Sequence, residues 1–155
     1  MTTQIDRTLE QLGLTLPNPA APIASYVPAV EAGGLLHISG QLPFKEDGSL
    51  MLGRLGEGDC DLAYGQEAAK RCALMLAAQI KAALGGFERV ERIVKLGVFI
   101  NSAADFIEQP QVANGASDLM VSLFGDAGKH ARSAVGVPVL PRGVAVEIDA
   151  IVAVR

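Results

Sequence analysis

The chain has 155 residues, with 13 Lys and Arg against 17 Asp and Glu, and a formal net charge of −4. This length suits one domain, because two domains of half the size would each have too small a hydrophobic core. The acidic balance argues against a polyanion-binding surface, since neutralising phosphates requires clustered Lys and Arg. Nucleic acid is therefore not an expected partner.

The two cysteines and the N-terminus predict a reduced, intracellular environment. Cys60 and Cys72 are twelve residues apart, a spacing that matches no metal-ligand pattern, and two cysteines make no disulfide framework. We expect no metal site and no cofactor. The first residues lack the basic and apolar regions of a signal peptide, and no apolar stretch approaches the roughly 20 residues that span a bilayer. The sequence therefore predicts a cytoplasmic protein without a membrane partner.

The mean hydropathy of +0.31 is high for a small monomer in which only 19% of residues are charged. Tight packing of a fold rich in Ala, Val and Gly is one explanation. The other is that part of the apolar surface lies in a subunit interface. We favour the second explanation.

The first third of the chain combines a short helix with a hairpin. Apolar residues at helical spacing predict an amphipathic helix over residues 3–12. Residues 16–22 hold three prolines and form a connector that is neither helix nor inner strand. Residues 26–30 and 35–39 are expected to be the two strands of a hairpin, joined by a turn at residues 31–34.

The rest of the chain alternates between helical and extended patterns. Five glycines in residues 40–58 predict an ordered loop with at most one short strand. The other predicted elements are a helix that begins after Asp59 or Asp61 and ends at Gly85-Gly86, a strand at 90–101, a helix at 109–124, and strands at 132–140 and 144–154.

This order, β-β-α-β-α-β-β after a short helix, fits an α+β sandwich with two long helices on one face of a mixed sheet. The last strand indicates what covers the other face. Its apolar positions alternate with a second set that includes Ala145, Glu147, Asp149 and Ile151. This mixture suits a partly polar subunit interface rather than open solvent.

Several motifs do not support the chemistry that they superficially suggest. The glycine-rich segment at 53–58 lacks a following Lys-Ser/Thr, and Glu57 and Asp59 would repel phosphate. His37 and His130 are not part of a metal-binding pattern, and no G-x-S-x-G motif is present. These absences argue against metal and covalent catalysis.

A candidate site remains at the ends of three strands. Ser39 and Gly40 follow an apolar strand and offer backbone N–H groups to an anion or a carbonyl oxygen. Arg132 begins another strand and is out of phase with the face formed by Ser133, Val135, Val137 and Val139, so it need not lie in the helix-packed core. Glu147 lies on the less buried face of the last strand. Spacing alone leaves solvated surface charges as the alternative for Arg132 and Glu147.

Three segments together resemble the signature of the YjgF/RidA family, members of which have also been labelled endoribonuclease L-PSP or translation inhibitor. These segments are Ile38–Pro43, Ala131–Val135 and Val146–Ile151. The resemblance extends over residues 23–155 and includes Tyr26 and the strand at 94–100. We therefore expect one domain at 23–155, preceded by an N-terminal helix and Pro-rich extension at 1–22.

The resemblance implies a chorismate-mutase-like α+β fold assembled as a homotrimer, with the sheets inward and the helices outward. It also implies hydrolysis of 2-imino or 2-enamino acids, such as 2-aminoacrylate, to 2-keto acids and ammonia in pockets between subunits. In that reaction Arg132 would hold the substrate carboxylate and Glu147 would orient water and move its proton. Tyr26 would close the pocket from a neighbouring chain. The implied substrate-binding residues are Tyr26, Ser39, Gly40, Asn114 (at the opening of the second long helix) and Arg132, and the implied catalytic pair is Arg132 and Glu147.

The chain also departs from the family pattern, which places it in a divergent subgroup. Ala134 stands where active members have cysteine, and residues 24–26 read Ala-Ser-Tyr in place of Gly-Pro-Tyr. The extension at 1–22 and the loop at 48–58 are further departures. The alternative function is non-catalytic binding of small carboxylates or keto acids by the same pocket. Ribonuclease activity is the least favoured, because the chain is acidic and has no histidine pair.

Overall fold

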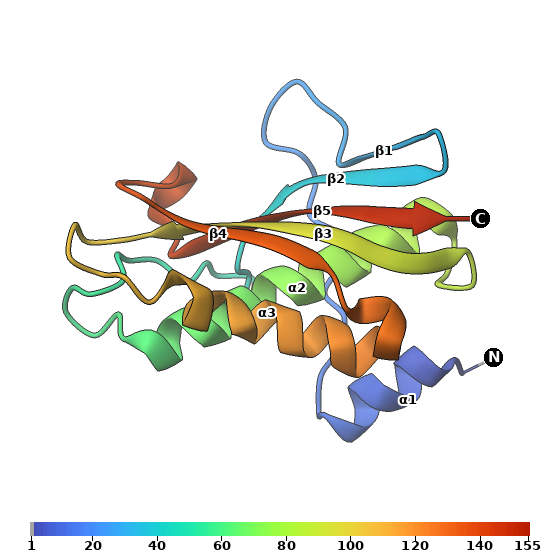
Figure 1. Ribbon diagram of the computed structural model, residues 1–155, viewed down its shortest axis with the longest axis horizontal. Helices are drawn as coiled ribbons and strands as arrows, with labels where there is room; N and C mark the ends of the chain where they lie inside the picture. Colours follow the sequence, from blue (N-terminus) through green and yellow to red (C-terminus); the bar gives the residue numbers. More distant parts are fainter. Residues whose placement is uncertain (1) are drawn as a thin grey trace.

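The structure is a computed structural model that describes residues 2–155. A five-stranded sheet is covered on one face by two long helices, with a short N-terminal helix beside them (Figure 1). Among the described residues, no helix is both long and apolar enough to cross a bilayer. The elements are α1 (Gln4–Gln11), β1 (Ala29–Ala32), β2 (Leu35–Gln41), α2 (Leu62–Leu84), β3 (Val90–Asn101), α3 (Gln109–Phe124), the 3-10 helix η1 (Gly125–Gly128), β4 (Ala131–Val137), the 3-10 helix η2 (Pro141–Gly143) and β5 (Val146–Val154).

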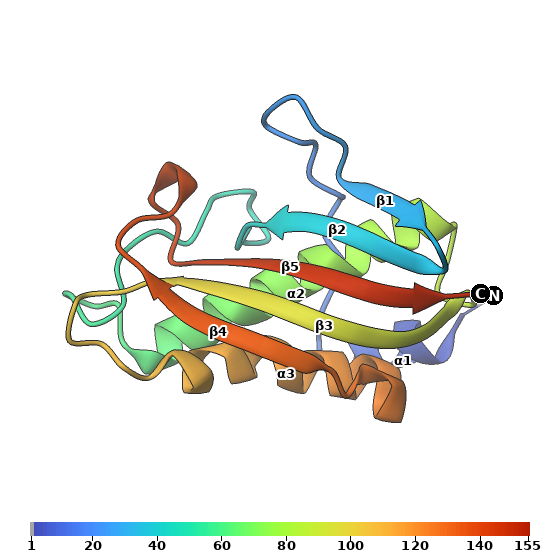
Figure 2. The same ribbon diagram turned by 45° about the horizontal axis from the view of Figure 1, so that its top comes forward.

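The strands lie in the order β1-β2-β5-β3-β4. All neighbours are antiparallel except β3 and β4, which are parallel and connected through α3. A parallel pair requires such a crossover connection, which places α3 against one face of the sheet. Figure 2 looks onto the opposite face, which no helix covers. The α+β class and the mixed sheet with helices on one face are confirmed.

The long helix α2 has defined ends and a buried middle. Asp61 caps its start by accepting a hydrogen bond from Tyr64 N at 2.9 Å, and Gly85 ends it with a φ of 75°. Gln79, which the sequence places off the apolar stripe, is buried. Its Nε2 donates to Ala20 O at 2.9 Å and to Gln41 Oε1 at 3.2 Å. The Pro-rich connector therefore covers a helix face that the sequence pattern leaves to solvent.

The predicted alternation along the last strand is confirmed, because every second residue of β5 is buried beneath the helices. The intervening residues are half-buried on the uncovered face. The buried set is Val146, Ile148, Ala150, Val152 and Val154, and the half-buried set is Glu147, Asp149, Ile151 and Ala153.

The edge strand β4 differs from the prediction in its length and in its orientation. Strand β4 ends at Val137 rather than at residue 140. The other edge strand, β1, also differs, because it begins at Ala29 rather than at residue 26. Arg132 pairs with Leu96, which is fully buried on the helix side, whereas Val135 is 45% exposed on the other side. The implied assignment of the Ser133 and Val135 face to the helix side is therefore wrong, and Arg132 faces the helices. The larger apolar residues of this edge strand therefore face the uncovered surface of the sheet. In most strands the apolar residues face the helix-packed core instead.

The crossing of α2 and α3 generates a test of the fold. A Cβ added at Gly115 would overlap the backbone of Gln66. Gly115→Ala should lower the free energy of unfolding by about 1–3 kcal/mol, because helix backbones yield poorly to overpacking. Helix propensity alone predicts the opposite sign, a gain of about 1 kcal/mol. Urea unfolding monitored by circular dichroism distinguishes the two, and the exposed Ser122→Ala on the same helix should change stability by less than about 0.5 kcal/mol.

Candidate functional site

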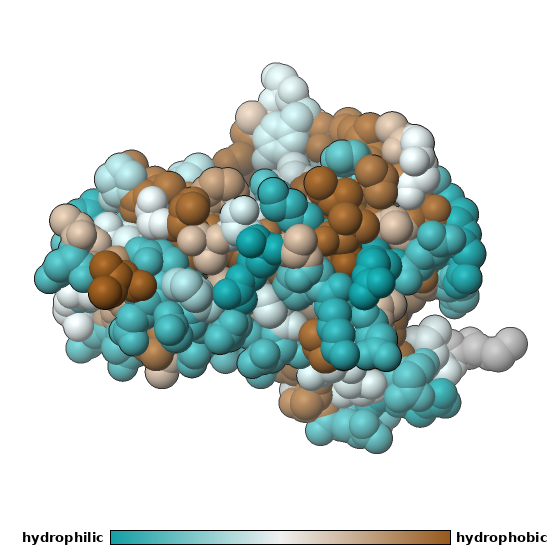
Figure 3. All heavy atoms as spheres, viewed as in Figure 1, coloured by the Kyte–Doolittle hydropathy of each residue, from teal (hydrophilic) through white to brown (hydrophobic). Residues whose placement is uncertain are grey.

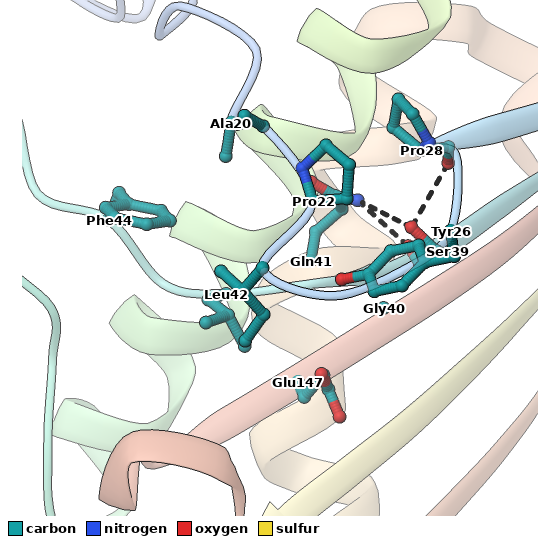
Figure 4. A pocket seen from close by; sticks show the side chains of 12 residues that line it. Ala20, Pro22, Tyr26, Pro28, Ser39, Gly40, Gln41, Leu42, Phe44 and Glu147 are labelled. Carbon is teal, nitrogen blue, oxygen red and sulfur yellow. Dashed lines mark hydrogen bonds between the residues drawn. The ribbon is translucent and has the colours of Figure 1, made fainter.

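Four of the predicted site residues line one small pocket at the end of β2. Tyr26, Ser39, Gly40 and Glu147 surround a cavity of about 40 Å³, together with the connector residues 20–23. Figure 4 shows the Tyr26 ring close to Ser39 and Gly40, with Glu147 on the neighbouring strand β5. The volume suits a few water molecules rather than a substrate. We call this group the acid half-site.

The local backbone brings the acid half-site together. The pairing of β2 with β5 shifts register between Ile38 and Gln41, so the chain bulges at Gly40. A Cβ at Gly40 would lie 2.8 Å from both Cδ and Oε1 of Glu147, so only glycine leaves room for this carboxyl group. Gly40 therefore presents bare backbone to the Glu147 side chain.

Hydrogen bonds fix the rim of this pocket. Ser39 N and Ser39 Oγ both donate to Pro28 O, at 3.0 and 3.2 Å, and Gln41 Nε2 donates to Ser39 O at 3.0 Å. These bonds hold the segment before β1 against β2. Tyr26 consequently lines the same pocket as Gly40 and Glu147 of its own chain.

The electrostatic environment of Glu147 favours its protonated form. Burial raises the pKa of Glu147 above its ordinary value of 4.5, and the negative charge of Asp149 raises it further. Burial also raises the pKa of Asp149. None of the ion pairs within residues 2–155 includes Glu147. A carboxylate whose pKa is raised is a stronger base than an ordinary glutamate, which suits it to accept and return a proton.

Arg132 and Asn114 form a second group, which we call the arginine half-site. Arg132 Nη1 donates to Asn114 Oδ1 at 2.9 Å and to Ser117 Oγ at 3.1 Å, and Nη2 donates to Pro110 O at 3.1 Å. Asn114 lies in the second turn of α3 rather than at its opening. All three acceptors are neutral, so the charge of Arg132 has no acid partner. Of the five guanidinium N–H groups, two remain free, which is the number that a bidentate carboxylate needs.

Ser117 and His130 belong to this half-site, although the sequence analysis did not select them. Ser117 Oγ lies 2.8 Å from His130 Nε2, and His130 Nδ1 lies 2.6 Å from Gly128 O. Because a carbonyl oxygen only accepts, Nδ1 carries a proton, and in the neutral ring the Ser117 hydroxyl donates to Nε2. That hydroxyl can then accept from Arg132. The three-residue spacing of Asn114 and Ser117 on one helix face was the available signal.

One chain does not bring the two half-sites together. Arg132 lies on the helix side of β4 beside Leu96, whereas Glu147 lies on the uncovered face of β5 beside Phe99. Strand β3 separates them, which places the two strand axes about 10 Å apart, with the thickness of the sheet in between. A compact substrate cannot contact both side chains of the same chain.

Comparison with known proteins shows similarity over almost the whole chain. The chain is 51% identical to Protein TCP17 of Trypanosoma cruzi, over 96% of this chain and 93% of that protein. The crystal structure of the protein Atu1372 from Agrobacterium tumefaciens is 44% identical, with a TM-score of 0.89 and coverage of 97% and 94%. RidA from an Antarctic Psychrobacter is 29% identical, with a TM-score of 0.61 and coverage of 90% and 96%.

A family model described as "YjgF/chorismate_mutase-like, putative endoribonuclease" matches residues 6–150. The expected chorismate-mutase-like fold is confirmed by this match and by the sheet and helices described above. The chain therefore belongs to the YjgF/RidA family.

Proposed function

We propose that this protein hydrolyses reactive 2-imino and 2-enamino acids to 2-keto acids and ammonia, in a pocket completed by two copies of the chain. The observation that carries the proposal is the pair of free guanidinium donors on Arg132. They suit the carboxylate that every such substrate contains. Glu147 supplies the group for the proton transfers that the hydrolysis requires.

Two features support a pocket shared between copies. The first is that the sheet separates the arginine half-site from the acid half-site of the same chain. The second is the apolar character of the uncovered sheet face, where Val30 and Val135 are 51% and 45% exposed. Figure 3 shows apolar residues gathered over β1, β2 and the adjoining part of β5. Burying this face against other copies, as in the homotrimer that the family resemblance implies, would set one chain's arginine beside another chain's acid.

The arginine half-site is suited to fix the substrate before reaction. Asn114, Ser117 and the Pro110 carbonyl hold the guanidinium plane, so little side-chain freedom is lost when a carboxylate binds. A bidentate, charge-assisted pair of this kind contributes about 1.5–3 kcal/mol. Holding the carboxylate places the adjacent C=N carbon at a fixed distance from the opposite wall of the pocket.

The acid half-site is suited to move protons. Water adds to the iminium carbon while Glu147 accepts a proton from that water, and the C=N electron pair moves to nitrogen. Glu147 then returns the proton to the amine nitrogen of the carbinolamine. The C–N bond breaks, the hydroxyl proton is released as the carbonyl forms, and the products are the 2-keto acid and an ammonium ion. The Glu147 carboxyl group lies over Gly40, where a Cβ would overlap it, and it lines the small pocket that would hold this water.

Non-catalytic binding of small carboxylates or keto acids is the second candidate. Ala134, on the same face of β4 as Arg132, has no polar group where active relatives are expected to carry a cysteine. Both functions use Arg132 to bind the carboxylate. They differ in turnover, because only hydrolysis releases ammonia faster than the uncatalysed reaction.

Replacing Arg132 tests the carboxylate-binding role. With 2-aminoacrylate generated in situ, Arg132→Gln should lower kcat/KM for ammonia release by about ten- to a hundredfold. Arg132→Lys should be only partly active, because an ammonium group lacks the planar fork. Arg92→Gln is the matched control and should keep full activity, because Arg92 donates to the backbone carbonyls of Asp126 and Lys129 and belongs to neither half-site. Unchanged activity in Arg132→Gln would refute the proposal.

The pH dependence tests the role of Glu147. A base must be ionised to act, so kcat/KM should fall as pH falls through the pKa of Glu147, which lies above 4.5. Asp149→Asn removes the nearby negative charge, so it should lower this pKa and move the acid limb of the profile to lower pH. Steady-state rates between about pH 4 and pH 8 measure the shift. An acid limb at the same pH in both proteins would contradict this role.

A further inference from the structure

A second, larger groove lies between the Pro-rich connector, the loop that follows β2 and helix α2. Its volume is about 770 Å³, which falls within the range of small-molecule sites. The groove and the acid half-site are neighbours, because they share four lining residues: Ala20, Ala21, Ile23 and Phe44. Neither Arg132 nor Glu147 contributes to this groove.

Arg71 provides a buried positive charge at the wall of this groove. Its side chain is only 6% exposed, and Nε donates to Phe44 O at 2.7 Å. None of the ion pairs in residues 2–155 includes Arg71. Every fully buried side-chain nitrogen among these residues has a hydrogen-bond partner, so the unbonded Nη groups of Arg71 are the ones that reach the groove. A buried charge without an acid partner favours a bound anion.

Arg142, in the 3-10 helix η2 that precedes β5, adds a second positive charge to the groove. Its φ of 59° makes it the one non-glycine residue in the described chain with a left-handed backbone. This conformation costs an arginine about 1 kcal/mol or more relative to glycine, and residues retained under such strain cluster at binding sites. Arg142 is exposed and lines the groove, as does Lys45, whereas Glu46 is the only acid in the lining. The groove is therefore basic in a chain whose net charge is −4.

The remaining walls are apolar and include Leu16, Phe44 and Met75. We infer that this groove binds a small organic anion, with its phosphate or carboxylate group at Arg71 and Arg142 and its apolar body against these walls. Arginine is suited to both groups because its planar fork matches their oxygens. This site is separate from the proposed hydrolytic pocket and does not depend on it. Its ligand would contact the same connector that walls the acid half-site.

Calorimetric titration of the full chain with phenyl phosphate, benzoate and inorganic phosphate tests the inference. Phenyl phosphate or benzoate should bind saturably and more tightly than inorganic phosphate, and the comparison shows which anionic group is preferred. Arg142→Gly should weaken binding about tenfold, because it removes one charge-assisted contact. Glycine suits the left-handed backbone at this position, so this variant should fold at least as well as the wild type. Arg71→Met should weaken binding further.

Two controls separate this groove from other anion sites. Arg7→Gln removes one exposed positive charge outside the groove and should leave binding unchanged. Arg132→Gln should also leave it unchanged, and loss of binding in that variant alone would place the anion at the arginine half-site. The inference is overturned by that result, by equal binding in wild type, Arg142→Gly and Arg71→Met, or by no saturable binding up to about 10 mM. Equal affinity for phenyl phosphate, benzoate and inorganic phosphate would overturn the contribution of the apolar walls.

Discussion

Arg132 carries its charge to the helix side of the sheet, where only neutral groups of α3 receive its hydrogen bonds. Had an acid of the same chain neutralised this charge, the free donors needed for a substrate carboxylate would be lost. The parallel pairing of β3 with β4 sets this arrangement, because it brings the start of β4 beside α3. The antiparallel pairing of β3 with β5 places the Glu147 carboxyl group on the opposite face. The proposed chemistry therefore depends on how copies of the sheet meet.

The uncovered face is built for close packing around carboxyl groups. Two acids that are neighbours on this face, Glu147 and Asp149, each lie against a glycine of an adjacent strand, Gly40 and Gly97, where a Cβ would overlap the acid. Burial raises the pKa of both acids, and repulsion between them adds to the effect at Glu147. Further burial by another copy would strengthen the desolvation that causes these shifts. The proposed assembly and the proposed proton transfer would thereby involve the same residues.

The sequence predicted most accurately the elements that have capping residues at their ends or a clear residue pattern along their length. Asp61 and Gly85 bound α2, and a run of β-branched residues sets β3 at residues 90–101. The sequence predicted the site residues but not their separation into an arginine half-site and an acid half-site. That separation depends on which face of β4 packs against α3. Val135 is apolar yet exposed, so the pattern of this edge strand pointed to the wrong face. His130 joins the site through a tertiary contact with Ser117 of α3 and a local contact with Gly128 O. A single sequence does not predict such a tertiary contact.

The shared pocket can be tested by co-expressing two variants, each of which lacks one of the two proposed groups. If each site takes its arginine from one copy and its acid from another, co-expressed Arg132→Gln and Glu147→Gln chains that assemble at random should rebuild roughly one site in four. The whole randomly assembled population should then release ammonia at about a quarter of the wild-type rate, well above the rate of either variant alone. Mixed assemblies as inactive as the separate variants would contradict the account, because both groups would then have to act from one chain.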